Sequence, residues 1–146
     1  MNELTKDIIH TADNFVKNFT DNPICPSIEP HPFDYSIKSL ETVDKLLEEI
    51  SDYALDEEAL DNTASMVGCY IFETARRNYG GEYLWIKKEQ QPVLIGGLPD
   101  FQVSIRAWEK VRGRLLNGKE DNIPFYVAGY KEHIDQAKKG DFIMIM

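Results

Sequence analysis

A stretch with apolar residues on every side of a predicted helix lies in the middle of the chain and constrains the fold most strongly. From Met66 to Phe72 the sequence reads MVGCYIF. It lies inside a segment predicted to be helical from Asp56, a favourable N-cap, to about Tyr79. Gly80 favours the left-handed conformation that ends a helix. A helix that is apolar all round is covered on more than one side, so we predict that it is central to the fold.

Four further segments repeat apolar residues at spacings of three and four, which predicts amphipathic helices. They cover residues 3–20, 36–54, 105–117 and 123–139. A proline-rich loop at 21–35 separates the first two, because proline cannot continue a helix. We expect this loop to pack across the surface through its apolar side chains. These are Ile24, Ile28, Phe33 and Tyr35.

The hydrophobic period changes after Gly80-Gly81 and predicts strands. The segments EYLWIKK at 82–88 and PVLI at 92–95 are joined by three residues, as in a hairpin. A short third strand is predicted at 101–105, where apolar and polar residues alternate. The order of elements predicts one α+β domain, residues 1–146, in which the helices pack against a small antiparallel sheet of about three strands.

The composition indicates a folded acidic protein. The net charge is −9 and the isoelectric point about 4.8, which disfavours nucleic acid and anionic membranes as partners and allows a basic protein. No apolar targeting signal and no stretch of roughly 18 apolar residues is present, so a cytoplasmic location is expected. Free thiols are expected at Cys25 and Cys69, although the sequence leaves one disulfide between them open. Cys69 is predicted to be a small core residue.

An acid and two arginines follow the apolar run. Glu73 and Arg77 are four residues apart with the acid first, which suits an ion pair at the edge of a helix. In a second interpretation Glu73 lies at the floor of a pocket and Arg76 binds a carboxylate or phosphate. Three aromatic residues would supply the walls of such a pocket. They are Tyr70, Tyr83 and Trp85. No second acid, base or metal ligand lies nearby in the sequence, so no catalytic residue is assigned.

Metal and cofactor motifs are missing from the sequence. Each of the histidines His10, His31 and His133 stands alone, without a partner at ligand spacing. The glycine pairs at 80–81 and 96–97 open no phosphate-binding pattern. We therefore expect no metal site and no cofactor.

Charge is distributed unevenly along the chain. Asp44, Glu48 and Asp52 are spaced by four on one face of the second predicted helix, whereas residues 106–119 are mainly basic. Ordinary solvation explains both segments. The functional alternative is an acidic face that docks a basic partner and steers its approach. The same polarity would permit head-to-tail contact between copies.

Three stretches resemble a bacterial family of small domains of unknown function. They are FDYSIKSLETVDKLL, GCYIFETARRNYGGEYLW and VRGRLLNGKEDNI. The resemblance covers roughly residues 33–125 and implies membership of the family without implying an activity. The positions on its motifs are Gly68, Tyr70, Glu73, Arg76, Gly80, Gly81, Trp85, Asn117, Gly118, Glu120 and Asp121.

Two hypotheses for the function follow. The first is a non-enzymatic protein-interaction domain, regulatory or immunity-like, that binds a basic partner through its acidic face. The second is a small-ligand-binding domain or enzyme with a pocket at Glu73 and Arg76. Self-association fits both, because the tail DFIMIM at 141–146 is predicted to be a weak strand or a segment packed on the core, and a second subunit would cover its apolar residues.

Overall fold

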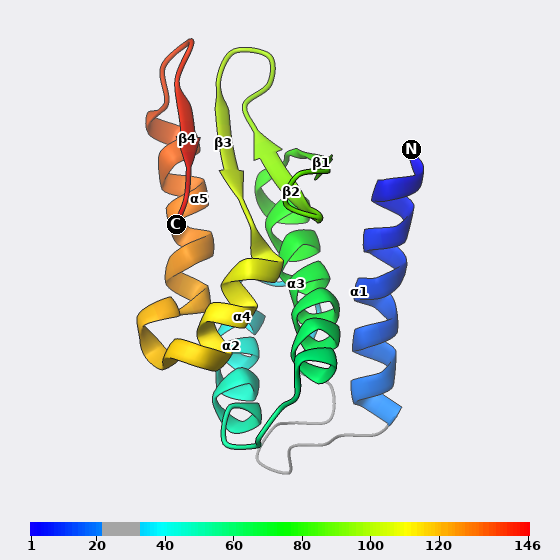
Figure 1. Cartoon of the computed structure of the whole chain (residues 1–146). Coiled ribbons are helices and arrows are strands. Elements are labelled where there is room, and N and C mark those ends of the chain that lie inside the picture. The colour runs from blue at the N-terminus through cyan, green and yellow to red at the C-terminus, as the bar shows by residue number, and fades with distance from the viewer. Residues whose placement is uncertain (22–32) are drawn as a thin grey trace.

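The computed structural model describes residues 1–21 and 33–146, and Figure 1 shows the arrangement of their helices and strands. Helix α1 lies beside α3, and α5 lies on the opposite side of the molecule. The helices are α1 (Glu3–Asp21), α2 (Ser39–Ile50), α3 (Glu57–Tyr79), α4 (Ala107–Asn117), the 3₁₀ helix η1 (Gly118–Asp121) and α5 (Ile123–Gln136). The strands are β1 (Glu82–Ile86), β2 (Gln91–Gly96), β3 (Gln102–Ile105) and β4 (Phe142–Met144).

Helix α3 is central, as its apolar run predicts. It packs against both α1 and α4, and every residue from Val67 to Ala75 is buried. The Asp56 side chain accepts a hydrogen bond from the backbone N–H of Ala59, and Gly80 ends the helix with a φ of 83°. The predicted beginning and end of this helix are therefore confirmed.

The α+β class is confirmed, but the sheet is larger than predicted. It has four strands in the order β1-β2-β3-β4, and only the pairs β1–β2 and β2–β3 are antiparallel. Strand β4 is parallel to β3, because α4 and α5 carry the chain back to the end of the sheet at which β3 begins. A strand of only three residues is too short for its pairing to be recognised from an alternating pattern.

The two faces of the sheet have different environments. Tyr83, Leu94 and Ile105 lie opposite one another across β1, β2 and β3 and belong to the main hydrophobic core. Val93 and Ile95 alternate with Leu94 and so point to the other face. Both are buried, yet neither belongs to the main core cluster. The main hydrophobic core therefore lies on one face of the sheet.

The helix predicted at 105–117 begins slightly late, at Ala107, and two other helices are shorter than predicted by a larger margin. The second helix begins at Ser39, because Ser36 caps a turn that precedes the helix and its Oγ accepts a hydrogen bond from the N–H of Ser39. This helix ends at Ile50. The last helix ends at Gln136, where Ala137 turns to an extended conformation. Both differences arise at helix ends, where apolar periodicity carries little information.

The proline-rich loop is described only in part. Residues 22–32, with Ile24, Ile28, Cys25 and His31, lie outside the described residues. Phe33 is buried, and its ring packs on those of Phe15, Phe19 and Tyr70 with centroid distances of 5.0 to 5.3 Å. In the described part, no helix combines the length and the apolar character needed to cross a membrane.

Candidate functional site

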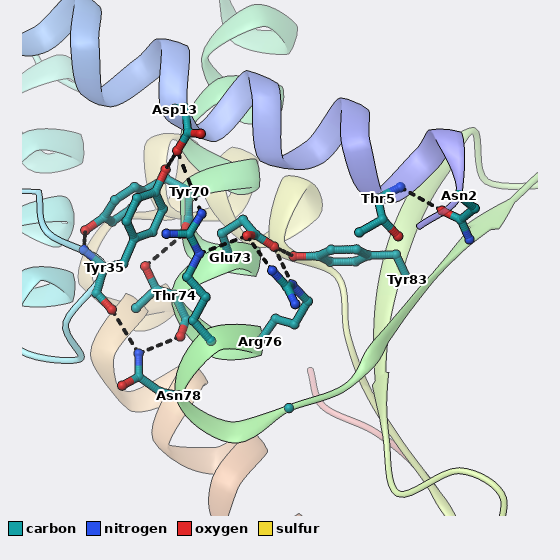
Figure 2. A network of polar contacts seen from close by, with 12 residues as sticks. Asn2, Thr5, Asp13, Tyr35, Tyr70, Glu73, Thr74, Arg76, Asn78 and Tyr83 are labelled. Carbon is teal, nitrogen blue, oxygen red and sulfur yellow. Dashed lines mark hydrogen bonds and ion pairs between the residues drawn. The ribbon is translucent and has the colours of Figure 1, made fainter.

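Glu73 is a fully buried carboxylate whose oxygens are occupied by hydrogen bonds (Figure 2). Its Oε1 accepts from Arg76 Nη2 at 2.9 Å and from Arg77 Nε at 3.0 Å. Its Oε2 accepts from Arg76 Nε at 2.6 Å and from the Tyr83 hydroxyl at 2.7 Å. The pairing with Arg76 is bidentate, the strong form of this interaction. These four contacts leave Glu73 little capacity to accept a proton from a substrate.

The protonation state of Glu73 follows from these contacts. Burial alone would raise its pKa, but the hydrogen bonds from Arg76, Tyr83 and Arg77 outweigh burial and hold the pKa below its ordinary value of 4.5. Burial, and then the negative charge of Glu73, raise the pKa of the Tyr83 hydroxyl. Glu73 therefore stays ionised and Tyr83 stays protonated at neutral pH. This arrangement suits a structural ion pair better than proton transfer.

The network extends from Glu73 to α1 and to the turn before α2. The Arg77 guanidinium lies 3.8 Å from the centroid of the Tyr35 ring, and its Nη2 lies 3.8 Å from Asp13 on α1. The Tyr35 hydroxyl donates to Asp13. The backbone N–H of Tyr35 donates to the Tyr70 hydroxyl at 3.0 Å (Figure 2). These contacts hold Tyr35 in a left-handed conformation with a φ of 63°, so the network joins three separate segments.

The structure does not bring the five predicted pocket residues together. Arg76 and Tyr83 line a hollow of about 350 Å³ whose other walls come from the N-terminus and β1. Glu73 and Tyr70 are completely buried, and Tyr70 packs in the aromatic cluster with Phe33. Trp85 lines a different hollow.

Two residues of the predicted acidic face bind an arginine of the same chain. Arg114 on α4 is 1% exposed, and its Nε and Nη2 donate to Asp44 at 2.9 and 3.1 Å. Its Nη2 also lies 2.7 Å from Glu48. The hydrogen bonds that Arg114 donates to these carboxylates outweigh the effect of burial and raise the pKa of Arg114. Asp52 lies beyond the end of α2 and is exposed. Part of the charge that the sequence assigns to a docking face thus neutralises a buried cation.

A groove absent from the sequence predictions lies around Trp108, at the start of α4. It consists of two neighbouring hollows of about 560 and 490 Å³, which share Trp108 and Ser65. We call the larger one the acidic hollow. Its walls are Asp61, Asn62, Ala64, Ser65, Glu89, Gln90, Gln91, Trp108, Glu109 and Arg112. We call the smaller one the aromatic hollow. Its walls are Leu4, Asp7, Ile8, Thr11, Ser65, Cys69, Trp85 and Trp108. Together they form the tryptophan groove.

The position of Trp108 depends on Gly68 in α3. A Cβ atom on Gly68 would lie 2.5 Å from Trp108 Cδ1 and 3.1 Å from the Trp108 backbone, so only glycine permits this close approach of α3 and α4. Trp85 of β1 meets Trp108 edge to face, with ring centroids 6.0 Å apart and an interplanar angle of 77°. Trp85 is 41% exposed. The two indoles therefore form a fixed aromatic corner, and Trp85 is the side of it that is exposed to solvent.

The groove carries more carboxylates than cations. Asp61 pairs with Arg112, and Glu89 forms a bidentate pair with Arg106 at 2.7 and 3.1 Å. The remaining carboxylates, Asp7 and Glu109, are exposed, and neither makes a salt bridge within the described part of the chain. The free thiol of Cys69 also lines the aromatic hollow, and burial raises its pKa to about 11. At neutral pH this thiol is protonated and therefore a poor nucleophile.

Comparisons with known proteins give no match to a family model, to a curated protein or to a solved structure. The resemblance to a family of unknown function stays a prediction that rests on the motifs. Among residues 1–21 and 33–146, no His, Cys, Asp and Glu side chains group in a way that would hold a metal ion.

Motif signals missed the groove because its residues come from five separate elements and the turn between β1 and β2. Trp108 and Ser65 belong to no sequence motif that indicates binding. Asp61 cannot be distinguished in the sequence from the other acidic residues near it. Gly68 is the one available signal, since a glycine inside an otherwise apolar helix indicates a close approach by another element.

Proposed function

We propose that this chain is a non-enzymatic protein-interaction domain that binds a basic, partly apolar segment of another protein in the tryptophan groove. The observation that carries the proposal is the union of an acidic and an aromatic hollow at Trp108. A regulatory or immunity-like role follows if the bound segment is one that the partner needs for its own activity. The proposal includes a cytoplasmic setting, which the free thiol of Cys69 fits.

Charge supports a basic ligand. Asp7 and Glu109 lie at the groove with no cation bound to them in the described part, and the protein as a whole carries a charge of −9. A lysine or arginine side chain would gain from both the local carboxylates and the overall field. The acidic face at Asp44 and Glu48 offers less, since those carboxylates already bind Arg114.

The aromatic corner supports a ligand with apolar or cationic side chains. Indole faces attract ammonium and guanidinium groups and also bury apolar side chains. In the described residues, the cations that lie over aromatic rings are on Tyr35, Tyr79 and Tyr126, so no cation of the described part lies over either indole. A segment that alternates basic and apolar residues would fill both hollows.

The alternative of a ligand pocket or an active site at Glu73 and Arg76 has weaker support. Arg76 reaches a hollow beside the N-terminus, but the Glu73 carboxylate already takes up two of its donors. An anion bound there would compete with the Glu73 carboxylate for the Arg76 guanidinium, and Glu73 is held in place by the core. For this reason we favour the tryptophan groove over this pocket.

The test uses the two tryptophans as reporters, since the chain contains only Trp85 and Trp108. A peptide of about ten residues that alternates arginine and leucine, an extended ligand long enough to span both hollows, is titrated into the protein and followed by fluorescence and calorimetry. We expect saturable binding with a shift in tryptophan emission. A matched peptide with glutamate in place of arginine should bind at least about tenfold more weakly.

Charge-reversal variants locate the site. Asp7→Lys combined with Glu109→Lys should weaken binding of the arginine–leucine peptide by about fivefold or more, because each reversal removes an exposed attraction and adds a repulsion. Asp52→Lys combined with Glu58→Lys is the matched control, because it makes the same charge change at exposed positions outside the groove. Equal effects of the two double variants, or equal affinity for the two peptides, would exclude the groove as a site for basic segments.

A further inference from the structure

Strand β4 forms an open edge of the sheet, on the side away from α1 (Figure 1). The N–H of Gln102 donates to the carbonyl of Asp141, and the N–H of Ile145 donates to the carbonyl of Ser104, both at 2.9 Å. Successive residues of a strand direct their main-chain groups to opposite sides. The N–H and C=O groups of Phe142 and Met144 therefore point away from β3. No other described main-chain group bonds to them.

The side chains along this edge are apolar and exposed. Phe142 is 74% exposed, Met144 is 42% exposed and Met146 is 86% exposed. Phe142 and Met144 alternate with Ile143, which packs against the core, so both lie on the sheet face opposite the main core. Proteins commonly protect an edge strand with lysine, proline or a bulge. The segment from Phe142 to Met146 contains none of these.

We infer that two copies of this chain pair through β4 to form a homodimer with one continuous antiparallel junction between their sheets. A two-fold axis at Ile143 places Phe142 of each copy opposite Met144 of the other. The outward N–H and C=O groups of these two residues then bond across the junction in both directions. The cross-strand neighbours become phenylalanine and methionine, a favourable sulfur–aromatic pair.

The charge and the length of the edge strand favour a second copy of this chain as its partner. Under this axis Asp141 falls opposite Ile145 of the other copy, so no like charges face each other at the junction despite the net charge of −9. The unpaired stretch is three residues long and matches itself in length and polarity. Because the edge is short, the interface belongs to the small class below about 1,200 Å², and association is expected in the micromolar to millimolar range.

Sedimentation equilibrium of the full chain between about 10 µM and 1 mM tests the inference, since it spans the range expected for a small interface. The average mass should rise from the 16.8 kDa of one chain towards twice that value. Met144→Lys should raise the dissociation constant at least about tenfold, because it places a charge on the junction. Phe142→Lys is a second variant at a more exposed position, in case Met144→Lys disturbs the fold.

Phe125→Lys is the matched control, because Phe125 is 80% exposed and belongs to α5 and not to the edge strand. The dimer should survive this change. Hydrogen exchange gives a second measurement, in which the amides of Phe142 and Met144 become protected as the concentration rises. A chain that stays monomeric at about 1 mM overturns the inference. So does a dimer that Phe125→Lys weakens as much as the edge variants do, or one in which the two edge amides stay unprotected.

Discussion

Glu73 shows how a charged residue is accommodated inside the core. Its carboxylate has no contact with solvent, and Arg76, Arg77 and Tyr83 together supply its hydrogen bonds. Removing one partner of a buried ion pair is costly because the remaining charge loses its compensation. The same contacts that stabilise Glu73 leave it unsuited to catalysis.

Glu73→Gln should lower the free energy of unfolding at pH 7 by about 2–4 kcal/mol, because two arginines lose their common carboxylate. The folded-state pKa of Glu73 lies below its ordinary 4.5. Its contribution is therefore fully present above pH 4.5 and is lost as the pH falls through the folded-state pKa. Urea unfolding of wild type and variant from pH 7 to about pH 3 should give stabilities that converge at low pH.

Glu82→Gln provides a control for this measurement, since Glu82 is an exposed acid at the start of β1. Its stability should follow that of the wild type at every pH. A constant difference between Glu73→Gln and the wild type across the whole pH range would contradict the assignment of an ionised, stabilising carboxylate.

Residue-level prediction from the sequence was partly successful. The pairing of Glu73 with Arg77 follows from helical spacing alone, and the structure contains it at 3.0 Å. The bond from Tyr83 does not follow, because it depends on how β1 packs against α3. Burial of Glu73 is likewise a property of the surrounding elements and not of its own sequence neighbourhood.

At the scale of elements, Asp44 joins three helices. Its Oδ1 accepts from Arg114 on α4 and, at 3.0 Å, from the backbone N–H of Ile123 at the start of α5. The ion pair with Arg114 spans 70 residues of sequence. Asp44 itself lies on α2, so one carboxylate fixes the positions of α2, α4 and α5 relative to one another.

Asp44→Ala should destabilise the protein by about 3–5 kcal/mol, because the almost fully buried Arg114 keeps only Glu48 as a carboxylate within ion-pair distance in the described part of the chain. Arg114→Met should cost less, since it removes the buried charge and retains most of the volume. The double variant should be more stable than Asp44→Ala alone. Urea unfolding of the two single variants and the double variant measures this coupling. Strictly additive effects would show that the two side chains do not act as a pair.

Elements with strong local signals were predicted well. Helix α3 has an N-cap, an apolar run and a terminating glycine, and each corresponds to a feature of the structure. Strand β4 has three residues and pairs in parallel with β3 only because α4 and α5 return the chain to that place. The sequence predicted either a weak strand or a segment packed on the core, and the tertiary structure decides for the strand.

At the scale of the whole molecule, one hydrophobic core connects all the helices. Buried residues of a single cluster come from every helix from α1 to α5 and from strands β1, β2 and β3. The aromatic residues Phe15 and Phe19 tie α1 to Phe33 and Tyr70. A core that is shared in this way links the unfolding of α1 to that of the remaining elements.

We therefore expect one cooperative unfolding transition. Far-ultraviolet circular dichroism reports the helices, while fluorescence reports Trp85 on β1 and Trp108 on α4. The two signals should change at the same urea concentration, as expected for a single domain. Two separate midpoints would show that the helical part and the sheet fold as independent units.

The sequence by itself determined the positions of the main helices, the hairpin and the α+β class, because periodicity, capping and turn residues act over a few neighbouring positions. The tertiary structure decided the partners of Glu73 and Asp44, the fourth strand and the tryptophan groove. Each of these joins residues that are far apart in the chain, and their distances depend on how completed elements pack. Local sequence therefore specifies which elements form, and packing specifies which side chains meet.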